Sequence, residues 1–173
     1  MTKLMVTRIQ SENLLEMAQN RLMLDEHLVA HANLDVRDKK SRNALFWAIK
    51  TSHKHNTDLL LTYNSSLFVQ PNYHALFHTI KYNDLRTFTL LLELGEDINM
   101  TNSDEQTLLM IAIKEENIMM VRYLINHGIN LYVHDRHGKT ALDYAKKRNN
   151  QMIFDLVHYK ILYQKLQNKK TLS

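Results

Sequence analysis

Two pairs of histidines have the spacing that a metal site on a helix requires. His27 and His31 are four residues apart, and so are His74 and His78. On a helix this spacing puts both imidazoles on one side, where their nitrogens could hold a zinc ion or a haem iron. No cysteine can add a ligand, and neither pair has the glutamate of the metalloprotease spacing. A metal- or haem-handling accessory of an enzyme is one hypothesis, although we expect no resident metal or cofactor.

The residues needed for other kinds of catalysis do not form a pattern in this sequence. A nucleophile requires a positioned base and an oxyanion site. The chain shows no serine motif, no glycine loop that could cradle phosphates and no convincing pair of carboxylates. We therefore predict that the protein is not an enzyme.

Composition indicates a folded protein with a mild positive charge. The 173 residues are 45% hydrophobic and 23% charged, with a formal net charge of +4 and no cysteine. Lys3, Arg8, Glu12 and Glu16 interrupt the N-terminal segment, so it lacks the apolar core of a signal peptide. No run approaches the length of a membrane span. We expect a cytoplasmic protein, with secretion by a route that needs no signal peptide left open.

The elements that must position these residues repeat with a period of about 33 residues. The residues 33 positions before Thr140, Leu142 and Ala145 are identical to them: Thr107, Leu109 and Ala112. A further step of 33 connects Leu109 to Leu76, and a step of 31 connects Leu76 to Leu45. A fixed period of this length indicates an array of stacked supersecondary units.

The letters within each period resemble ankyrin repeats. "DRHGKTALDYA", "NALFWAI" and "QTLLMIAI" are similar to the turn and first helix of that family, and "LLLELGEDINM" and "YLINHGINLYV" to its second helix and finger, over Leu28 to Val157. The resemblance implies an all-α fold, an ankyrin-repeat solenoid of helix-turn-helix units with short hairpin fingers. We expect a degenerate N-terminal capping repeat at 1–37, repeats at 38–68, 69–101 and 102–134, and a C-terminal repeat with an extended capping helix at 135–173.

Several residues have predictable roles within these units. Thr140 should cap a first helix, and Gly128 should end a second helix in the left-handed conformation. Ser11 is a candidate cap for the first helix of the degenerate unit. The polar segment Lys54–Thr57 predicts that the second helix of repeat 38–68 starts late or is distorted. The repeat register predicts that His78 is buried between helices, in one column with Trp47, Ile111 and Tyr144.

The resemblance implies a non-enzymatic module that binds a partner protein through a concave face, as an accessory, inhibitor or adaptor. A secreted effector that acts on a host protein stays open as an alternative. In the family the partner contacts the finger tips and the exposed ends of the first helices. Among the matching positions, we expect these to bind the partner: Lys39, Lys40, Arg42, Lys50, Tyr73, Lys81, Tyr82, Gln106, Lys114, Arg136, His137, Lys139, Lys147 and Arg148.

Charge along this face predicts the chemistry of the partner. The predicted binding residues include ten lysines and arginines, whereas the only acidic side chains at the matching positions are Asp104 and Glu115. A positive field of this kind steers acidic surfaces toward it and weakens with salt. We therefore expect a protein partner with an acidic surface, no membrane or nucleic-acid partner, and a monomer when the chain is alone.

Overall fold

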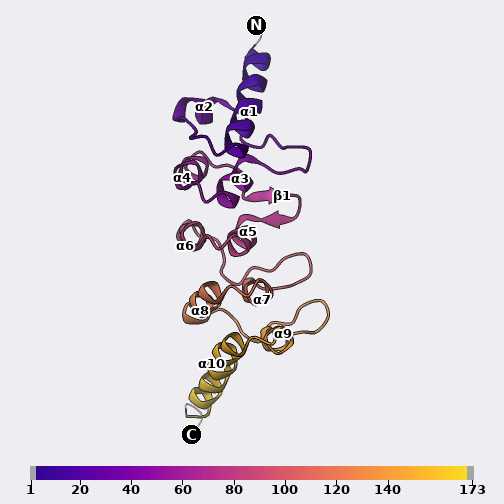
Figure 1. The fold of residues 1–173 in the computed structure, drawn as a ribbon. Helices are drawn as coiled ribbons and strands as arrows, with labels where there is room; N and C mark the ends of the chain where they lie inside the picture. Colours follow the sequence, from indigo (N-terminus) through magenta and orange to yellow (C-terminus); the bar gives the residue numbers. More distant parts are fainter. Residues whose placement is uncertain (1–2, 171–173) are drawn as a thin grey trace. The chain divides into compact units, whose positions relative to one another are not determined.

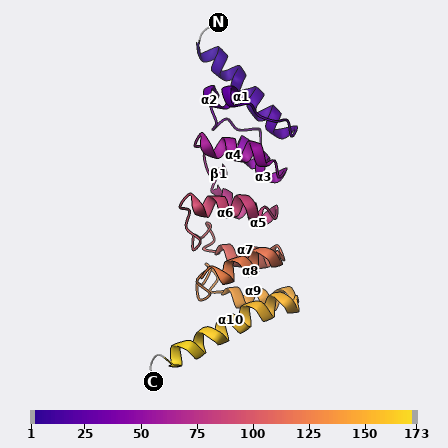
Figure 2. The ribbon, with the colours of Figure 1, turned by 90° about the vertical axis from the view of Figure 1, so that its left-hand side faces the viewer.

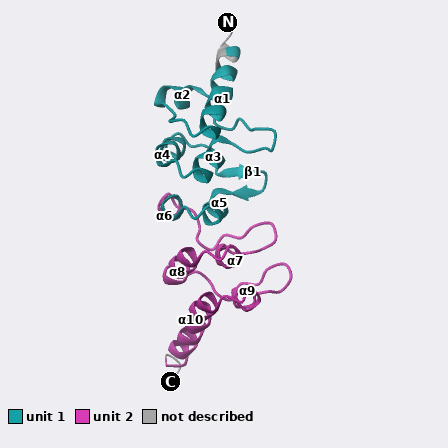
Figure 3. Ribbon diagram, in the orientation of Figure 1, with its two compact units in different colours: residues 1–88 teal, residues 89–173 magenta. Residues whose placement is uncertain are grey.

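The computed structural model describes residues 3–170 and divides the chain into two compact units, 1–88 and 89–173 (Figure 3). The division falls inside α6 (Leu85–Glu93). Within each unit the described residues form pairs of helices joined by turns, with loops that project beside the first helix of a pair (Figure 1). The predicted all-α, helix-turn-helix fold class is confirmed.

Unit 1 is built from pairs of helices and a short hairpin. Its elements are α1 (Lys3–Gln19), α2 (Glu26–His31), α3 (Ala44–Lys50), α4 (Lys54–Thr62), β1 (Phe68–Gln70), β2 (Tyr73–His74), α5 (Ala75–Lys81) and the start of α6. Helix α3 packs between α1 and α5, and α4 packs on α3 and α2. The antiparallel hairpin sets Phe68 opposite His74 and Gln70 opposite Tyr73, which leads the chain directly into α5.

Unit 2 repeats the helix pair twice. Its elements after α6 are α7 (Leu108–Lys114), α8 (Ile118–Asn126), α9 (Ala141–Arg148) and α10 (Gln151–Lys170). Helix α7 packs on α8 and α9, and α10 packs on α8 and α9. A bridge between Thr101 and Thr107 closes the loop before α7. Figure 2 shows that α10 continues well past the end of α9.

Each first helix begins with a side-chain cap at the same place in the repeat. Asn43, His74, Thr107 and Thr140 accept a hydrogen bond from a backbone N–H in the first turn of α3, α5, α7 and α9. The Thr140 cap is confirmed as a capping box, because Asp143 in turn accepts from the Thr140 N–H at 2.9 Å. These hydrogen bonds from Thr140 hold the pKa of Asp143 below its usual value. Asparagine and histidine therefore replace threonine in unit 1.

The turns of the repeat use left-handed backbone at two recurring positions. Between the two helices of a pair the left-handed residue is Ser52, Asn83, Glu116 or Asn149, with φ between 52° and 54°. At the finger tip it is Ser41, Asn72, Glu105 or Gly138, with φ between 56° and 71°. Gly128, at φ 80°, confirms the predicted left-handed end of α8. The 31- and 33-residue offsets of the sequence thus recur in the backbone angles.

The predicted late start of the second helix in repeat 38–68 is wrong. Helix α4 starts at Lys54, directly after His53, whose Nδ1 accepts from the Asn56 N–H at 3.4 Å. Asn56 and Thr57 are 0% and 1% exposed, and they occupy the positions that the buried Met120 and Val121 hold in α8. Asn56 fits there because its carboxamide accepts from the Leu24 N–H at 2.9 Å and donates to the Leu22 carbonyl at 2.8 Å.

This buried amide gives a stability prediction. Replacing Asn56 with alanine leaves the Leu24 N–H buried without its partner and removes the hydrogen bond to the Leu22 carbonyl, so the free energy of unfolding should fall by about 1–3 kcal/mol. Urea unfolding followed by circular dichroism measures the change. The exposed Asn13 in α1 supplies a control, since Asn13→Ala should change the same quantity by less than about 0.5 kcal/mol. Equal effects of the two substitutions would show that the amide does not connect α4 to the segment before α2.

The expected cap at Ser11 is also wrong. Helix α1 starts at Lys3, so Ser11 lies in its interior, where the Ser11 hydroxyl donates to the Thr7 carbonyl at 2.7 Å. The same oxygen accepts from the Asn33 N–H at 2.8 Å, and Ser11 is 4% exposed. Ser11 is therefore not a helix cap: its buried hydroxyl connects α1 to the loop after α2.

Candidate protein-binding face

The finger before α3 is held by a carboxylate and carries two exposed lysines. Asp38 accepts from the Lys40 and Arg42 N–H groups at 2.8 and 3.0 Å, and its carboxylate pairs with the Arg42 guanidinium at 2.6 Å. Burial raises the pKa of Asp38, but the hydrogen bonds from Arg42 and Lys40 outweigh it and hold that pKa below its ordinary value. Lys39 and Lys40 are exposed at the tip. The acid that holds this finger is thus already neutralised by Arg42.

Trp47 lies under two cations on the exposed side of α3. The Arg42 guanidinium carbon is 4.2 Å from the centre of the Trp47 ring, and the Lys50 ammonium nitrogen is 4.7 Å from it. Trp47 is half-buried, and its indole N–H has no hydrogen-bond partner in the described structure. Sequence reasoning did not select Trp47 as a binding residue, because the repeat register placed it in a column that packs between helices. Its spacing of five from Arg42 and three from Lys50 was the available signal.

His78 lies next to Phe46, the residue before this tryptophan. The His78 side chain is 1% exposed, which confirms its predicted burial. Its Nε2 donates to the Phe46 carbonyl at 3.2 Å, which leaves the buried Nδ1 without a partner. The ring centres of Tyr82 and Tyr73 lie 4.7 and 5.9 Å from that of His78. Burial is the main cause that lowers the pKa of His78 to about 4; the Phe46 hydrogen bond opposes this fall, and the charges of Lys81 and Lys50 add to it. Both lysines therefore act on the same ring.

Unit 1 thus brings together most of the residues predicted on its face. We define the aromatic–basic cluster as Arg42, Trp47, Lys50, Lys81 and Tyr82. No ion pair to an acidic side chain is present for Lys39, Lys40, Lys50 or Lys81 within residues 3–170. Lys50, which lies over an aromatic ring without a neutralising carboxylate, suits a ligand that supplies negative charge.

The predicted residues of unit 2 are more strongly engaged with their own neighbours. Gln106 is 7% exposed, and its amide donates to the Tyr144 hydroxyl at 2.6 Å and accepts from Lys114 at 3.2 Å. The Tyr144 hydroxyl donates to Asp135 at 2.6 Å, and this hydrogen bond is the largest cause of the fall in the pKa of Asp135 to about 2. Gln106 and Lys114 thus belong to a hydrogen-bond network that connects α7 to α9.

Two further cations of unit 2 face acids of the preceding repeat. Arg136 lies 3.6 Å from Asp104, and it also donates to the Ser103 carbonyl. Arg148 lies 3.8 Å from Glu116. The remaining predicted residues of this unit, His137, Lys139 and Lys147, are exposed. The positive charge of unit 2 is therefore partly neutralised, which a comparison of residues 32 or 33 positions apart could have anticipated.

The histidine pairs do not form a metal site of three or more ligands. The ring centres of His27 and His31 lie 4.4 Å apart with tilted planes, and the His31 Nδ1 donates to the His27 carbonyl at 2.8 Å. His74 Nδ1 accepts from the Leu76 N–H at 3.2 Å, while His78 bonds to Phe46. Across residues 3–170, no group of three or more histidine or acidic side chains could hold a metal ion. The described helices also include none that is long and apolar enough to cross a membrane.

The model of the family "Ankyrin repeats (3 copies)" matches residues 14–102 and 76–167. The chain belongs to the ankyrin-repeat family. Ankyrin repeats generally mediate protein–protein interaction, and the family is generally non-enzymatic. The face of finger tips and first helices is therefore the part of this ankyrin-repeat protein on which a protein partner is expected.

Relatives of this ankyrin chain come from viruses, bacteria and eukaryotes. It is 31% identical to an ankyrin repeat protein of Acanthamoeba polyphaga mimivirus over 66% of its own length and 16% of the relative. It is 34% identical to an ankyrin repeat-containing protein of Treponema pallidum over 49% of its length and 28% of the relative. An L-asparaginase of Dirofilaria immitis is 30% identical over 72% of this chain but only 21% of that enzyme. The chain thus spans less than a third of these relatives, and the name of the asparaginase describes that protein.

Proposed function

We propose that this chain is a non-enzymatic binding module that takes an acidic region of a partner protein on the finger and first-helix face of unit 1. The observation that supports the proposal is the aromatic–basic cluster. Its cations lie over Trp47 or act on His78, and the one nearby acid, Asp38, is occupied by Arg42. A carboxylate from a partner would relieve repulsion between these cations as well as bind them.

The aromatic side chains of the cluster supply area that charge alone does not. Interface energy is concentrated in a few residues, most often tryptophan, tyrosine and arginine, at the centre of the contact. Unit 1 offers Trp47, Tyr82 and Arg42 in this arrangement, with Tyr73 beside them and Lys39 and Lys40 at the rim. We infer that these residues form the main contact, and that His137, Lys139 and Lys147 of unit 2 contribute charge.

The geometry favours an acidic protein over a single-stranded nucleic acid. Basic and aromatic side chains can also bind nucleic acid, provided that a ring face is open for a base to stack on. Here the Arg42 guanidinium and the Lys50 ammonium already lie over the Trp47 ring. The Tyr82 ring lies in T-shaped contact with the rings of His78 and Phe46. Trp47 therefore presents cations, rather than a free ring face, to a ligand.

Charge reversal in unit 1 tests the proposed function. Lys50→Glu and Lys81→Glu should each reduce capture of the partner from native cells by about tenfold, because each places a carboxylate where the partner's acid binds. Capture is measured by quantitative mass spectrometry of material retained on immobilised protein. Lys54→Glu is the matched control, since Lys54 is exposed in the first turn of α4 and should leave capture unchanged.

Salt and fluorescence provide two independent readouts of the same contact. Capture should weaken as the salt concentration rises from about 50 to about 300 mM. Trp47 is the only tryptophan of the chain, so the intrinsic fluorescence reports directly on the cluster when the identified partner is added. Equal capture by Lys50→Glu and Lys54→Glu, or binding of the partner with no change in Trp47 emission, would place the contact elsewhere on the molecule.

A further inference from the structure

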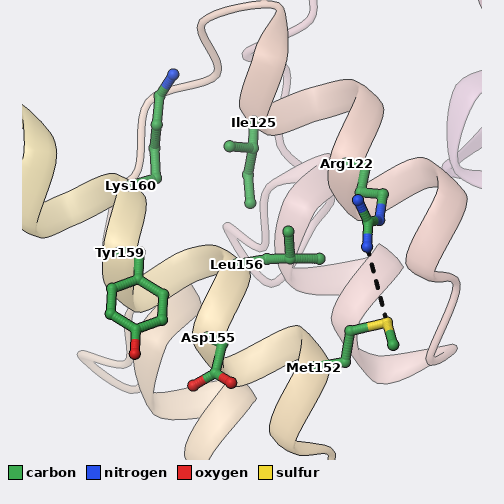
Figure 4. Close-up of a pocket in the computed structure, with 7 residues that line it drawn as sticks. All are labelled: Arg122, Ile125, Met152, Asp155, Leu156, Tyr159 and Lys160. Carbon is green, nitrogen blue, oxygen red and sulfur yellow. Dashed lines mark hydrogen bonds between the residues drawn. The ribbon is translucent and has the colours of Figure 1, made fainter.

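An apolar pocket of about 570 Å³ lies between α8 and α10 in unit 2 (Figure 4). Ile125 of α8 and Met152, Leu156 and Tyr159 of α10 supply its apolar side chains. We call it the α8–α10 pocket, and the complete lining is Arg122, Ile125, Met152, Asp155, Leu156, Tyr159 and Lys160. None of these residues was selected from the sequence, and none belongs to the aromatic–basic cluster.

The pocket is the start of a longer apolar stripe on the outer side of α10. Along that side, apolar residues recur at alternating spacings of four and three. The stripe consists of Met152, Leu156, Tyr159, Tyr163 and Leu166, of which all but Leu156 are between 51% and 64% exposed. A different side of α10 packs on the rest of unit 2, through the buried Ile153, Val157 and Ile161. Helix α10 therefore has a second apolar side that nothing in unit 2 covers.

This spacing fits another helix as the occupant. Residues that alternate by three and four lie along one line of a helix and interdigitate with a second helix at a shallow crossing angle. Ile125 adds a second wall, so that an incoming helix would lie between α8 and α10. In α10 no residue from 162 to 170 is buried, and a helical end without packing is only marginally stable in water.

Charge around the stripe indicates that the incoming helix is acidic. Arg122 and Lys160 stand on opposite sides of the pocket (Figure 4), and Lys165 and Lys169 follow along α10. Asp155 is the single acid of the lining, and its carboxylate already accepts from the Gln151 amide at 2.8 Å. A second copy of this chain would bring the same excess of cations against itself, so an acidic partner complements the stripe better.

We propose that the α8–α10 pocket and the apolar stripe bind an amphipathic helix of a partner protein whose apolar side is flanked by glutamate or aspartate. Leu156 at the base of the pocket receives one apolar side chain of that helix, and Tyr159 and Tyr163 receive the next along the line. Arg122 and Lys160 pair with its flanking carboxylates. This surface shares no residue with the aromatic–basic cluster, and the proposal does not depend on the function proposed for unit 1.

Two synthetic helices of matched design test the proposal on the full chain. Each has about 18 residues, with leucines at alternating spacings of three and four and alanine elsewhere; one carries glutamate beside the leucines and the other carries lysine. Methyl NMR of the protein reports binding at Ile125 and Met152. The glutamate peptide should shift both methyl signals and bind about tenfold more tightly than the lysine peptide. Tyr159→Glu should weaken the glutamate peptide about tenfold, whereas the matched Tyr132→Glu, at a tyrosine exposed outside the pocket, should not.

The other outcomes overturn the proposal. Equal binding of the two peptides would remove the role of charge. Methyl shifts confined to residues outside the pocket, or none at about 1 mM peptide, would remove the site. Self-association of the chain that Tyr159→Glu abolishes, or binding to anionic vesicles that it abolishes while the peptides fail, would assign the stripe to a second copy or to a lipid surface instead.

Discussion

Replacing Leu109 with alanine should lower the free energy of unfolding by about 2–5 kcal/mol, the largest single effect that we expect. Leu109 is 0% exposed in the first turn of α7, the helix that packs on both α8 and α9. Truncation removes three buried carbon atoms and leaves a cavity that the close-packed helices fill only in part. Because neighbouring repeats stabilise one another, the loss should spread beyond α7.

Urea unfolding followed by far-ultraviolet circular dichroism measures this change. Leu94→Ala is the matched control, since Leu94 is 61% exposed at the end of α6 and should cost less than about 0.5 kcal/mol. A Leu109→Ala loss as small as that of the control would mean that α7 does not form the core of unit 2.

Acidification should destabilise the fold through His78 by about 3 kcal/mol as the pH falls from 6.5 to about 4. The pKa of this buried imidazole is lowered from its ordinary 6.5 to about 4, first by burial. In that interval the unfolded chain binds a proton at His78 that the folded chain does not, so the free energy of unfolding falls with the pH. The contribution is fully present above about pH 6.5 and lost at about pH 4.

A variant without a titrating side chain isolates this contribution. His78→Gln keeps an amide that can donate to the Phe46 carbonyl but cannot take up a proton. Urea titration at pH values from about 7 to about 4 measures the free energy of unfolding of wild type and variant. Over this interval the free energy of unfolding of the wild type should fall by about 3 kcal/mol more than that of the variant. A difference that does not vary with pH would show that the His78 ring titrates normally in the folded chain. Carboxylates such as Asp135, with a pKa of about 2, lose their contribution at lower pH.

The period, the start of α9 and the end of α8 could be predicted from the sequence, since caps and turns depend on residues close together in the chain. Thr140 and Gly128 have their predicted conformations because a cap and a left-handed turn are decided by local backbone geometry. Ser11 and Asn56 were misjudged because their hydrogen bonds reach Asn33, Leu24 and Leu22, and contacts of that range are set by the packing of the repeats.

The candidate site was predictable only in its outline. The register predicts Lys50 and Lys81 at equivalent positions of successive repeats, whereas the stacking of Arg42 on Trp47 depends on side-chain geometry. In unit 2 the pairing of Arg136 with Asp104 crosses from one repeat to the next. A count of lysines and arginines includes such paired residues, and it therefore overstates the charge that a partner meets.

The left-handed turns leave unused stability in the molecule. Of the eight turn positions between paired helices and at finger tips, three hold asparagine and one holds glycine. The other four, Ser41, Ser52, Glu105 and Glu116, adopt a left-handed conformation that disfavours residues other than glycine and asparagine. Such positions are where directed evolution or consensus engineering commonly finds stabilising substitutions. Ser41 and Ser52 carry no charge, so asparagine at these two turns should raise the melting temperature while the charge of the molecule stays the same. Stability gained at these turns would offset the loss of stability that substitutions elsewhere in the chain cause.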